Sequence, residues 1–218
     1  MTASGAGALG VWHGVAAGQE KAVEDWYDRE HHVERLAVPG FLRARRYVNL
    51  GQGPRYFSRY DVAEVGVLAS APYLAALNAP SPWSQRIFPH YRATVRGAFE
   101  VKARRGAADG GVIATLRFAS DPFAANAATT CAAILDALRR SPGVLRAEAW
   151  RADVATTAAP TMEKTLRTGA DACPASALVI DGSSAETLRE ALAQAIPEPL
   201  RKSAEIDLLQ LAFNAVAA

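Results

Sequence analysis

The sequence PGFLRA at residues 39–44 returns as PGVLRA at residues 142–147, an offset of 103 positions. Both copies follow a helix-like stretch, and Pro-Gly is a pair that ends a helix and starts a turn. Self-similarity at a fixed offset indicates a repeated structural unit. The 218 residues are therefore predicted to form two modules, 1–105 and 106–218, joined near the glycine-rich stretch 104–111. A module of about 100 residues is large enough to bury its own core.

The same order of elements is expected in both modules, from alternating hydrophobicity for strands and helical spacing for helices. In the first module the expected strands are 8–16, 41–49, 55–62 and 93–103, with helices at 19–37 and 65–78. In the second they are 111–118, 144–152, 176–181 and 205–215, with helices at 122–140 and 184–196. Residues 153–175 are rich in Ala and Thr and predict no definite element.

This βαββαβ order is the ferredoxin-like plan, an α+β fold in which both helices cover one face of a four-stranded antiparallel sheet. The other face of each sheet also needs a cover. Two such sheets can face each other within one chain and enclose either a core or a pocket.

Composition excludes several classes of function. A net charge of +2 is too small for a nucleic-acid-binding surface. No run of 18 apolar residues occurs, and the N-terminus has no secretory signal pattern. Cys131 and Cys173 lack metal-ligand spacing and are expected to be buried free thiols. We therefore expect a cytoplasmic protein that binds neither nucleic acid nor membrane.

The two modules differ in the side chains that carry chemistry. All four His, all six Tyr and three of the four Trp lie in residues 1–105. The first module also has an excess of five positive charges, whereas the second has an excess of three negative charges. We expect the functional site in the first module and a degenerate copy in the second.

The segment WYDREHHVERLAVPGF, residues 26–41, points to a family. It resembles the helix-and-turn signature of the EthD-like proteins of the dimeric α/β-barrel superfamily, in which an aromatic residue, a His near the end of the first helix and Pro-Gly lead into the second strand. The resemblance implies two tandem ferredoxin-like βαββαβ modules whose antiparallel sheets pack face to face as an intramolecular dimeric α/β barrel. That superfamily includes small-molecule monooxygenases, muconolactone-type isomerases and haem enzymes, so the fold alone specifies no reaction.

His32 is the first candidate for catalysis, because it matches the His of that signature better than His31 does. The helix expected at 19–37 has an apolar stripe formed by Val23, Trp26, Val33 and Ala37. At about 100° per residue, both histidines lie on the flanks of this stripe, where a side chain reaches a pocket rim and stays partly wet. Such an imidazole suits a general acid or base near neutral pH. The plainer alternative, favoured for His31, is an interaction with the helix dipole.

Glu30 is the third catalytic candidate. It falls close to the middle of the same stripe, where a carboxylate must find a partner or raise its pKa. A bond to an Arg, a Tyr or a backbone group of the sheet is the structural explanation, and a catalytic carboxylate is the alternative.

Candidates for substrate binding lie on the strands. Alternation in the strand after the first Pro-Gly places Arg43, Arg45 and Tyr47 on the face turned away from the helices. With Tyr60 and His13 from neighbouring strands, they are expected to line a pocket for an aromatic or anionic small molecule. The alternative is that Arg43 and Arg45 pair with carboxylates across the interface.

The proline-rich stretch 79–92 has no counterpart in the second module. Connecting segments carry function more often than core segments do. Its aromatic residues, including Trp83 and His90, are expected to form a lid or pocket wall, or else to cap the open end of the sheets.

Three hypotheses for function follow. The first is an EthD-like small-molecule enzyme without a cofactor or metal, in which His32 transfers a proton and Arg and Tyr side chains hold the substrate. The second is a haem protein of the same superfamily, although the second module has no His to serve as an axial ligand. The third is a non-catalytic binding or stress-related module. Exposed sheet edges would make a homodimer reasonable.

Overall fold

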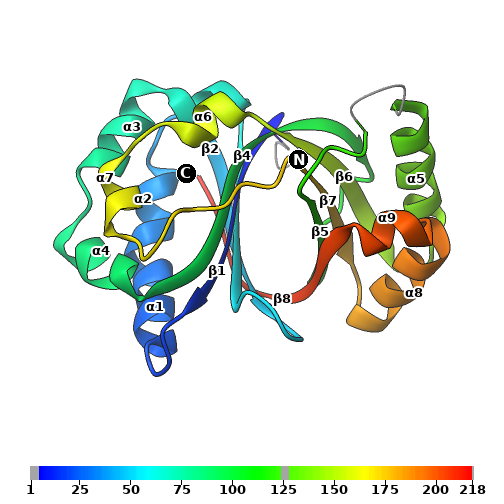
Figure 1. Ribbon diagram of the computed structural model, residues 1–218, viewed down its shortest axis with the longest axis horizontal. Coiled ribbons are helices and arrows are strands. Elements are labelled where there is room, and N and C mark those ends of the chain that lie inside the picture. The colour runs from blue at the N-terminus through cyan, green and yellow to red at the C-terminus, as the bar shows by residue number, and fades with distance from the viewer. Residues whose placement is uncertain (1–4, 124–127, 218) are drawn as a thin grey trace.

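The computed structural model describes residues 5–123 and 128–217. Eight antiparallel strands close into one barrel in the order β1-β3-β2-β8-β5-β7-β6-β4. The strands are β1 (Gly7–Val15), β2 (Phe41–Asn49), β3 (Tyr56–Val62), β4 (Tyr91–Arg105), β5 (Val112–Phe118), β6 (Val144–Ala152), β7 (Ser176–Gly182) and β8 (Ala204–Val216). Helices cover the barrel on two opposite sides (Figure 1).

Each half of the barrel is one ferredoxin-like sheet. The first half has the order β4-β1-β3-β2, and the second has the equivalent order β8-β5-β7-β6. The predicted fold, two tandem βαββαβ modules forming an intramolecular dimeric α/β barrel, is confirmed. The sheet edges pair with each other, β2 with β8 and β4 with β6, and this pairing closes the barrel. The open sheet edges expected to favour a homodimer are therefore largely absent from the described residues, and the homodimer itself stays a prediction.

The two halves also share local detail. The pairing of β2 with β3 shifts register between Phe41 and Arg43, and the pairing of β6 with β7 shifts at the equivalent place, between Val144 and Arg146. Such a shift is the signature of a β-bulge, which bends a strand and redirects its side chains. The Trp12 Nε1–H donates to Thr115 Oγ1 across the barrel over 3.2 Å, and these residues are 103 positions apart.

The first helical segment contains a turn that the sequence pattern did not predict. It runs as α1 (Glu20–Trp26), a π-helical turn η1 (Tyr27–His31) and α2 (His32–Leu36). The wider turn delays every later side chain by one position, about 100° of rotation. Val33, predicted to lie in the apolar stripe, is 56% exposed, whereas His31, His32 and Arg35 are buried. The predicted stripe is therefore wrong after Trp26.

Two stretches of the first half, the expected second helix and the proline-rich stretch, each fold as two short helices. The segment expected as helix 65–78 consists of a 3-10 helix η2 (Val65–Ala69) and α3 (Ala71–Asn78). The proline-rich stretch folds mainly as α4 (Pro82–Ile87) and a 3-10 helix η3 (Phe88–His90). Ser70 and Ser81 cap α3 and α4, each accepting a backbone N–H through its side chain.

The second half is covered by α5 (Ala128–Arg140), α8 (Ala185–Ala195) and α9 (Glu198–Lys202). Its apolar core includes Leu116, Leu135, Ile180 and Leu188. The expected helix 122–140 is observed as α5, and residues 124–127 of that expectation lie outside the described residues. Cys131 is buried as expected, but Cys173 is exposed, and both are free thiols. No helix in the described part of the chain is long and apolar enough to cross a membrane.

The space between the two sheets is filled by side chains. Its apolar part includes the fully buried rings of Trp12, Tyr47, Phe57, Phe99 and Trp150. Its polar part is a network of buried charges on β2, β3, β6 and β7, which includes Arg45, Arg59, Asp61, Arg146, Glu148 and Asp181. A hollow between the sheets, lined by the first module, was expected. The structure shows a packed core there.

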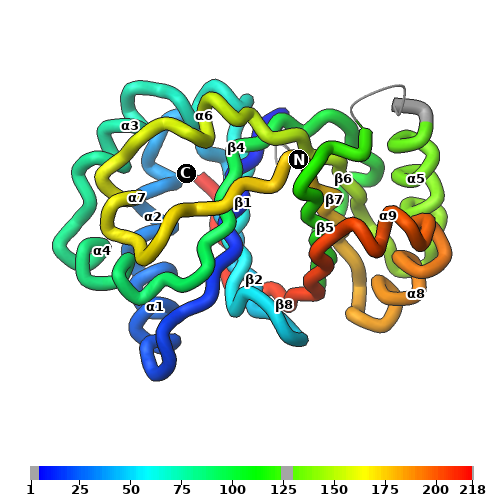
Figure 2. Tube along the Cα trace, viewed as in Figure 1, coloured from blue at the N-terminus to red at the C-terminus, as the bar shows by residue number. Residues whose placement is uncertain are grey.

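Residues 153–175, which predicted no definite element, form a strap. The strap carries α6 (Val154–Ala158) and α7 (Met162–Leu166). It leaves the second half after β6, lies over the outer face of the first half beside α2 and α3, and returns to β7 (Figures 1 and 2). Hydrogen bonds join it to β4, from Asp153 N to Ala98 O and from Arg96 N to Ala172 O, both 2.8 Å. The second half therefore contributes side chains to the first.

Candidate functional site

An aromatic and histidine cluster lies between the first helical segment and the sheet. Its hydroxyl and imidazole groups form a chain. The Tyr91 hydroxyl lies 2.5 Å from the Tyr27 hydroxyl, which lies 2.9 Å from His13 Nε2. His13 Nδ1 lies 2.8 Å from the backbone oxygen of Gly14.

The carbonyl at one end sets the direction of this chain. Because a carbonyl oxygen only accepts, His13 Nδ1 must carry the proton, and Nε2 of the neutral ring must accept. Tyr27 therefore donates to His13, and Tyr91 donates to Tyr27. Burial lowers the pKa of His13 to about 3, which keeps this tautomer neutral. The Tyr91 ring stacks on His13 with centroids 3.8 Å apart.

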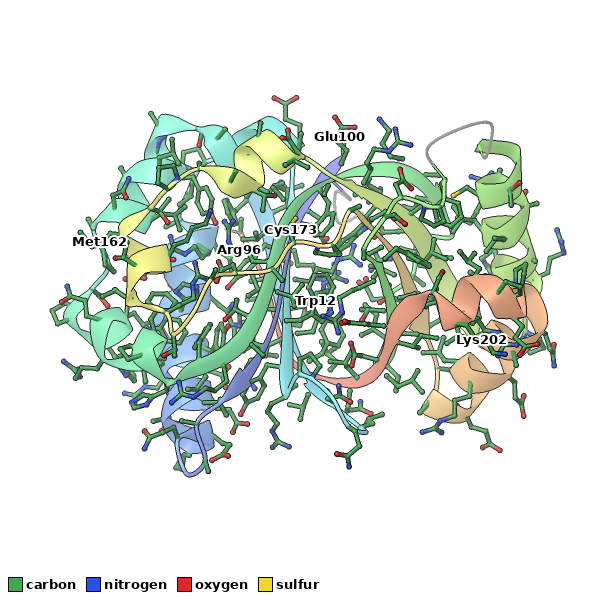
Figure 3. All side chains as sticks on the ribbon, viewed as in Figure 1. Trp12, Arg96, Glu100, Met162, Cys173 and Lys202 are labelled. Carbon is green, nitrogen blue, oxygen red and sulfur yellow. The ribbon has the colours of Figure 1, made fainter. Side chains whose placement is uncertain are left out.

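A small enclosed cavity lies beside the chain, under the strap. It holds about 20 Å³ open to water-sized molecules, room for about one water. Its walls are Leu9, Val11, Tyr27, His31, Arg35, Tyr60, Tyr73, Phe88, Tyr91, Arg96, Glu163 and Arg167. They come from β1, β3, β4, α3, η3, the first helical segment and the strap, so only the tertiary fold brings them together. Figure 3 labels Arg96 on β4 in the region of the strap.

The cavity is positively charged. Arg35 is paired with Glu163, and Arg167 Nη2 lies 3.2 Å from Asp171 Oδ2. Arg96 donates to the neutral Tyr73 hydroxyl over 3.1 Å and pairs with no carboxylate among the described residues. Three guanidinium groups thus face two carboxylates, which favours an anion in this space.

Several polar atoms of the cavity have no partner within the described structure. They are His31 Nδ1, Tyr60 Oη, Arg35 Nη1 and Arg167 Nε, all buried. Buried polar groups are nearly always hydrogen-bonded, so a group of orphans around one cavity indicates a bound water or ligand. This convergence singles out the cavity as the candidate site.

His31 lies on the cavity wall with its ring stacked on Trp26, centroids 4.2 Å apart. Burial, followed by the charge of Arg35, lowers the pKa of His31 well below its usual value. Its imidazole is therefore neutral, with a nitrogen free to accept a proton from a molecule in the cavity.

His32 occupies a different environment. Its ring is fully buried between Tyr27 and Phe213, with both centroid distances 4.7 Å, and neither nitrogen has a partner. Burial, followed by Arg46, lowers its pKa well below the usual value. The expectation that His31 and His32 stay partly wet is wrong, because the π-helical turn rotates both rings toward the sheet.

Glu30 is half-buried on the side of the helix that faces α4, and it accepts the Ser81 hydroxyl over 2.5 Å. The predicted partner, an Arg, a Tyr or a backbone group of the sheet, is therefore wrong, because the observed partner is the serine that caps α4. A catalytic role for Glu30 stays a prediction. Trp83 packs at the edge of the aromatic cluster, and His90 is half-buried at the end of η3. The proline-rich stretch does supply cavity wall, through Phe88 and Tyr91.

The predicted substrate-binding residues do not form one group, because they lie on both faces of the sheet. His13 and Tyr60 face the helices, next to the candidate cavity. Arg43, Arg45 and Tyr47 belong to the barrel side. There Arg43 and Arg45 both pair with Asp109 of the second half, the latter over 2.7 Å. This is the carboxylate pairing considered as the alternative.

The sequence pattern missed Tyr27, Arg35, Arg96 and the strap residues Glu163 and Arg167. Tyr27 and Arg35 lie within the segment that resembles the EthD-like signature, so a search restricted to its polar residues could have included them. Glu163 and Arg167 had no signal, because their stretch predicted no element.

A haem does not fit beside these histidines. The cavity that His31 lines holds about 20 Å³, whereas pockets for drug-sized ligands hold about 300–1,000 Å³. His32 is wedged between two rings. The described residues also contain no group of three or more His, Cys, Asp or Glu side chains arranged to hold a metal.

Comparison with known proteins agrees with the fold. No family model matches the chain, and no curated protein matches its sequence. An anthrone oxidase-like protein has a similar structure, with a TM-score of 0.58, 12% identity, and coverage of 97% of this chain and 93% of that chain. A protein provisionally assigned as a monooxygenase from Fusobacterium nucleatum is also similar. Its TM-score is 0.59 and its identity 7%, with coverage of 98% of this chain and 96% of that chain.

A mutant chlorite dismutase from Candidatus Nitrospira defluvii gives a TM-score of 0.53, 10% identity, and coverage of 95% and 90%. Identities this low carry information on fold and not on reaction. Taken with the closed barrel, these structures show that the chain has the fold of the dimeric α/β-barrel superfamily.

Proposed function

We propose that the protein is a small-molecule enzyme that removes a proton from an aromatic substrate and stabilises the resulting oxyanion. The observation that supports this is the buried, unpartnered Nδ1 of His31 in a cavity lined by Arg35, Arg96 and Arg167. The fold is shared with proteins described as monooxygenases and as anthrone oxidase-like. Aromatic walls from Tyr60, Tyr73 and Phe88 suit an aromatic ring once the strap moves, because the closed cavity holds only about one water.

In the proposed step, the proton leaves an acidic C–H bond of the substrate and binds a nitrogen of His31. The electron pair of that bond stays on the substrate and is delocalised onto an oxygen. Arginine donors next to that oxygen stabilise its developing charge. The same charge favours the imidazolium form of His31, which is disfavoured while the cavity is empty.

The hydroxyl chain contributes recognition. Because Tyr91 donates its own proton to Tyr27, the lone pair of Tyr91 that remains can accept a donor from the substrate. We expect the substrate to carry a hydroxyl group or an acidic C–H near Tyr91. His31 replaces His32 as the proposed proton acceptor, because His31 lines the cavity and His32 lies between two rings.

Kinship with the EthD-like proteins and an origin by tandem duplication are also proposed. The helix-and-turn segment supports the first. The repeated Pro-Gly pattern, the equivalent strand orders and the equivalent register shifts support the second.

A non-catalytic binding module is the second candidate, because the cavity in its closed form holds about one water and the strap covers it. The experiment that separates the two is anaerobic proton–deuterium exchange. Aromatic C–H acids such as anthrone are incubated with the protein in D₂O, and the loss of the acidic proton signal is followed by NMR.

Wild-type protein is expected to accelerate exchange, and His31→Gln to slow it by about 10²–10⁴-fold, the usual contribution of a positioned base. His90→Gln is the control, because His90 lies outside the cavity walls. Unchanged exchange in His31→Gln removes His31 from the role. Binding of these compounds without accelerated exchange would favour the binding module.

A further inference from the structure

One carboxylate in the arginine cavity comes from the other half of the molecule. Glu163 lies on α7 of the strap, is buried, and is paired with Arg35 of the first helical segment. The nearby charges of Arg167 and Arg96 also act on it. The Glu163 side chain thus presents to these arginines the same chemical group, a carboxylate, that a carboxylate ligand would present.

Glu163 does not use all the donors of the site. Within the part of the chain that the structure describes, Arg35 Nη1 and Arg167 Nε are buried without a partner, and the Arg96 guanidinium donates only to Tyr73. A guanidinium group has five N–H donors and matches a carboxylate best through two parallel bonds. The site can therefore hold a carboxylate better than it holds Glu163.

The strap is attached firmly at its ends and lightly in the middle. At one end, the Asp153 backbone N–H donates to Ala98 O of β4. At the other end, Ala172 N–H donates to Thr94 O, and Arg96 N–H donates to Ala172 O. The bonds from residues 160–170 to the first half all involve side chains in the described structure. They are Met162 N to Asn78 Oδ1 at 2.9 Å, Thr168 Oγ1 to Pro89 O at 3.1 Å, Arg92 Nη1 to Thr168 Oγ1 at 3.3 Å, and the ion pair of Glu163.

The middle of the strap also has few buried apolar contacts, because its buried side chains, those of Thr161, Glu163 and Arg167, are polar. Met162 is 49% exposed (labelled at the edge of the molecule in Figure 3), and Gly169, with φ of +83°, has open space where a Cβ would lie. Leu166 packs against the aromatic cluster from outside as a partly buried residue. Segments with few buried apolar contacts and exposed hydrogen bonds open at low cost.

We propose that Glu163 is an internal ligand that occupies the binding place of an aromatic carboxylate, and that such a ligand enters by displacing α7. Arg35 and Arg96 stay behind, because α2 and β4 carry them, and they bind the incoming carboxylate. The ring of the ligand packs against Tyr60, Tyr73 and Phe88. This inference rests on the proposed function, since it names the substrate class of the same cavity.

The test compares two probes of equal shape and different charge, 1-naphthoate and 1-naphthamide, by fluorescence titration. Glu163→Gln removes the internal carboxylate and keeps an amide of the same size. It is expected to bind naphthoate roughly 10- to 100-fold more tightly than wild type, the value of a charge-assisted bond. Asp153→Asn is the matched control, because it removes a strap carboxylate outside the cavity and keeps a residue able to cap α6. It is expected to leave both affinities unchanged.

A second variant keeps the test informative if Glu163→Gln folds poorly. Thr168→Ala removes an exposed strap bond and leaves the cavity charges intact, so it is expected to tighten naphthoate binding about 2- to 10-fold. Hydrogen–deuterium exchange should also become faster in residues 160–170 when naphthoate binds.

Equal affinity of wild type and Glu163→Gln for naphthoate overturns the proposal, as does equal tightening of both probes. Unchanged protection of residues 160–170 in the bound state overturns the displacement of α7. Binding is read without turnover, so these outcomes are independent of whether the protein catalyses proton exchange.

Discussion

Acidification should destabilise this protein through His13, because the folded protein buries this imidazole in its neutral form. Burial lowers the pKa of His13 to about 3 in the folded protein, against about 6.5 in an unfolded chain. Between these two pH values, the unfolded chain therefore binds a proton at His13 and the folded protein does not. The stability contributed by His13 is fully present above pH 6.5 and is lost as the pH falls from 6.5 to about 3.

At pH 4.5, two units below the unfolded value, the loss amounts to about 2.7 kcal/mol, since each unit is worth about 1.36 kcal/mol. The measurement is the free energy of unfolding by urea at pH 7.5 and pH 4.5. His13→Gln keeps an acceptor able to reach Tyr27 and cannot take up a proton. It should lose about 2.7 kcal/mol less than wild type between the two pH values.

Carboxylates and the other histidines also titrate over this range, but they are present in both proteins and cancel in the difference. His90→Gln, outside the buried chain, is the control for the loss of a histidine side chain as such. If His13→Gln loses as much stability as wild type on acidification, His13 does not titrate as its burial requires.

Three further predictions concern stability, each measured as the free energy of unfolding. Val33→Glu should change it by no more than about 0.5 kcal/mol, because the π-helical turn exposes Val33, and a loss above about 2 kcal/mol would indicate a regular helix. Tyr27→Phe should cost more than Tyr91→Phe, since it leaves His13 Nε2 and the Tyr91 hydroxyl unpaired, at about 1–3 kcal/mol for each group. An equal cost would mean that Tyr27 does not join His13 to Tyr91. Glu148→Gln should cost about 3–5 kcal/mol, because it removes a fully buried negative charge from a network in which Arg59 and Arg146 keep their other carboxylates but gain an uncompensated positive charge, and a neutral result would mean that the network is solvated.

The predicted strands were reliable because strand signals are local. Strands 41–49 and 144–152 have the predicted bounds, and the others differ from them by at most two residues at either end. Pro-Gly set the start of two of them, and period-2 alternation set the rest. In the strand expected at 55–62, Tyr56, Ser58 and Tyr60 alternate with Phe57, Arg59 and Asp61, and the structure places Tyr60 under the helices and Phe57 inside the barrel.

The helix that carries the histidines shows where local reasoning fails. A period of 3.6 residues was assumed through the whole segment, and one π-helical turn changed the phase. All positions up to Trp26 kept the predicted face, and those after it did not. The positions of His31 and His32 depended on this phase, so their predicted exposure was wrong although their residue types were noticed.

The element order, the two-module plan and the half of the chain that holds the histidines and tyrosines could be predicted from the sequence, because repeats, turns and composition are visible among neighbouring residues. The closure of the sheets into a packed barrel and the position of the cavity under the helices follow from the assembled fold alone. So does the strap from the second half, which supplies Glu163, 128 positions away from its partner Arg35. Contacts over such separations are selected by packing and charge in the assembled fold, and no local period records them.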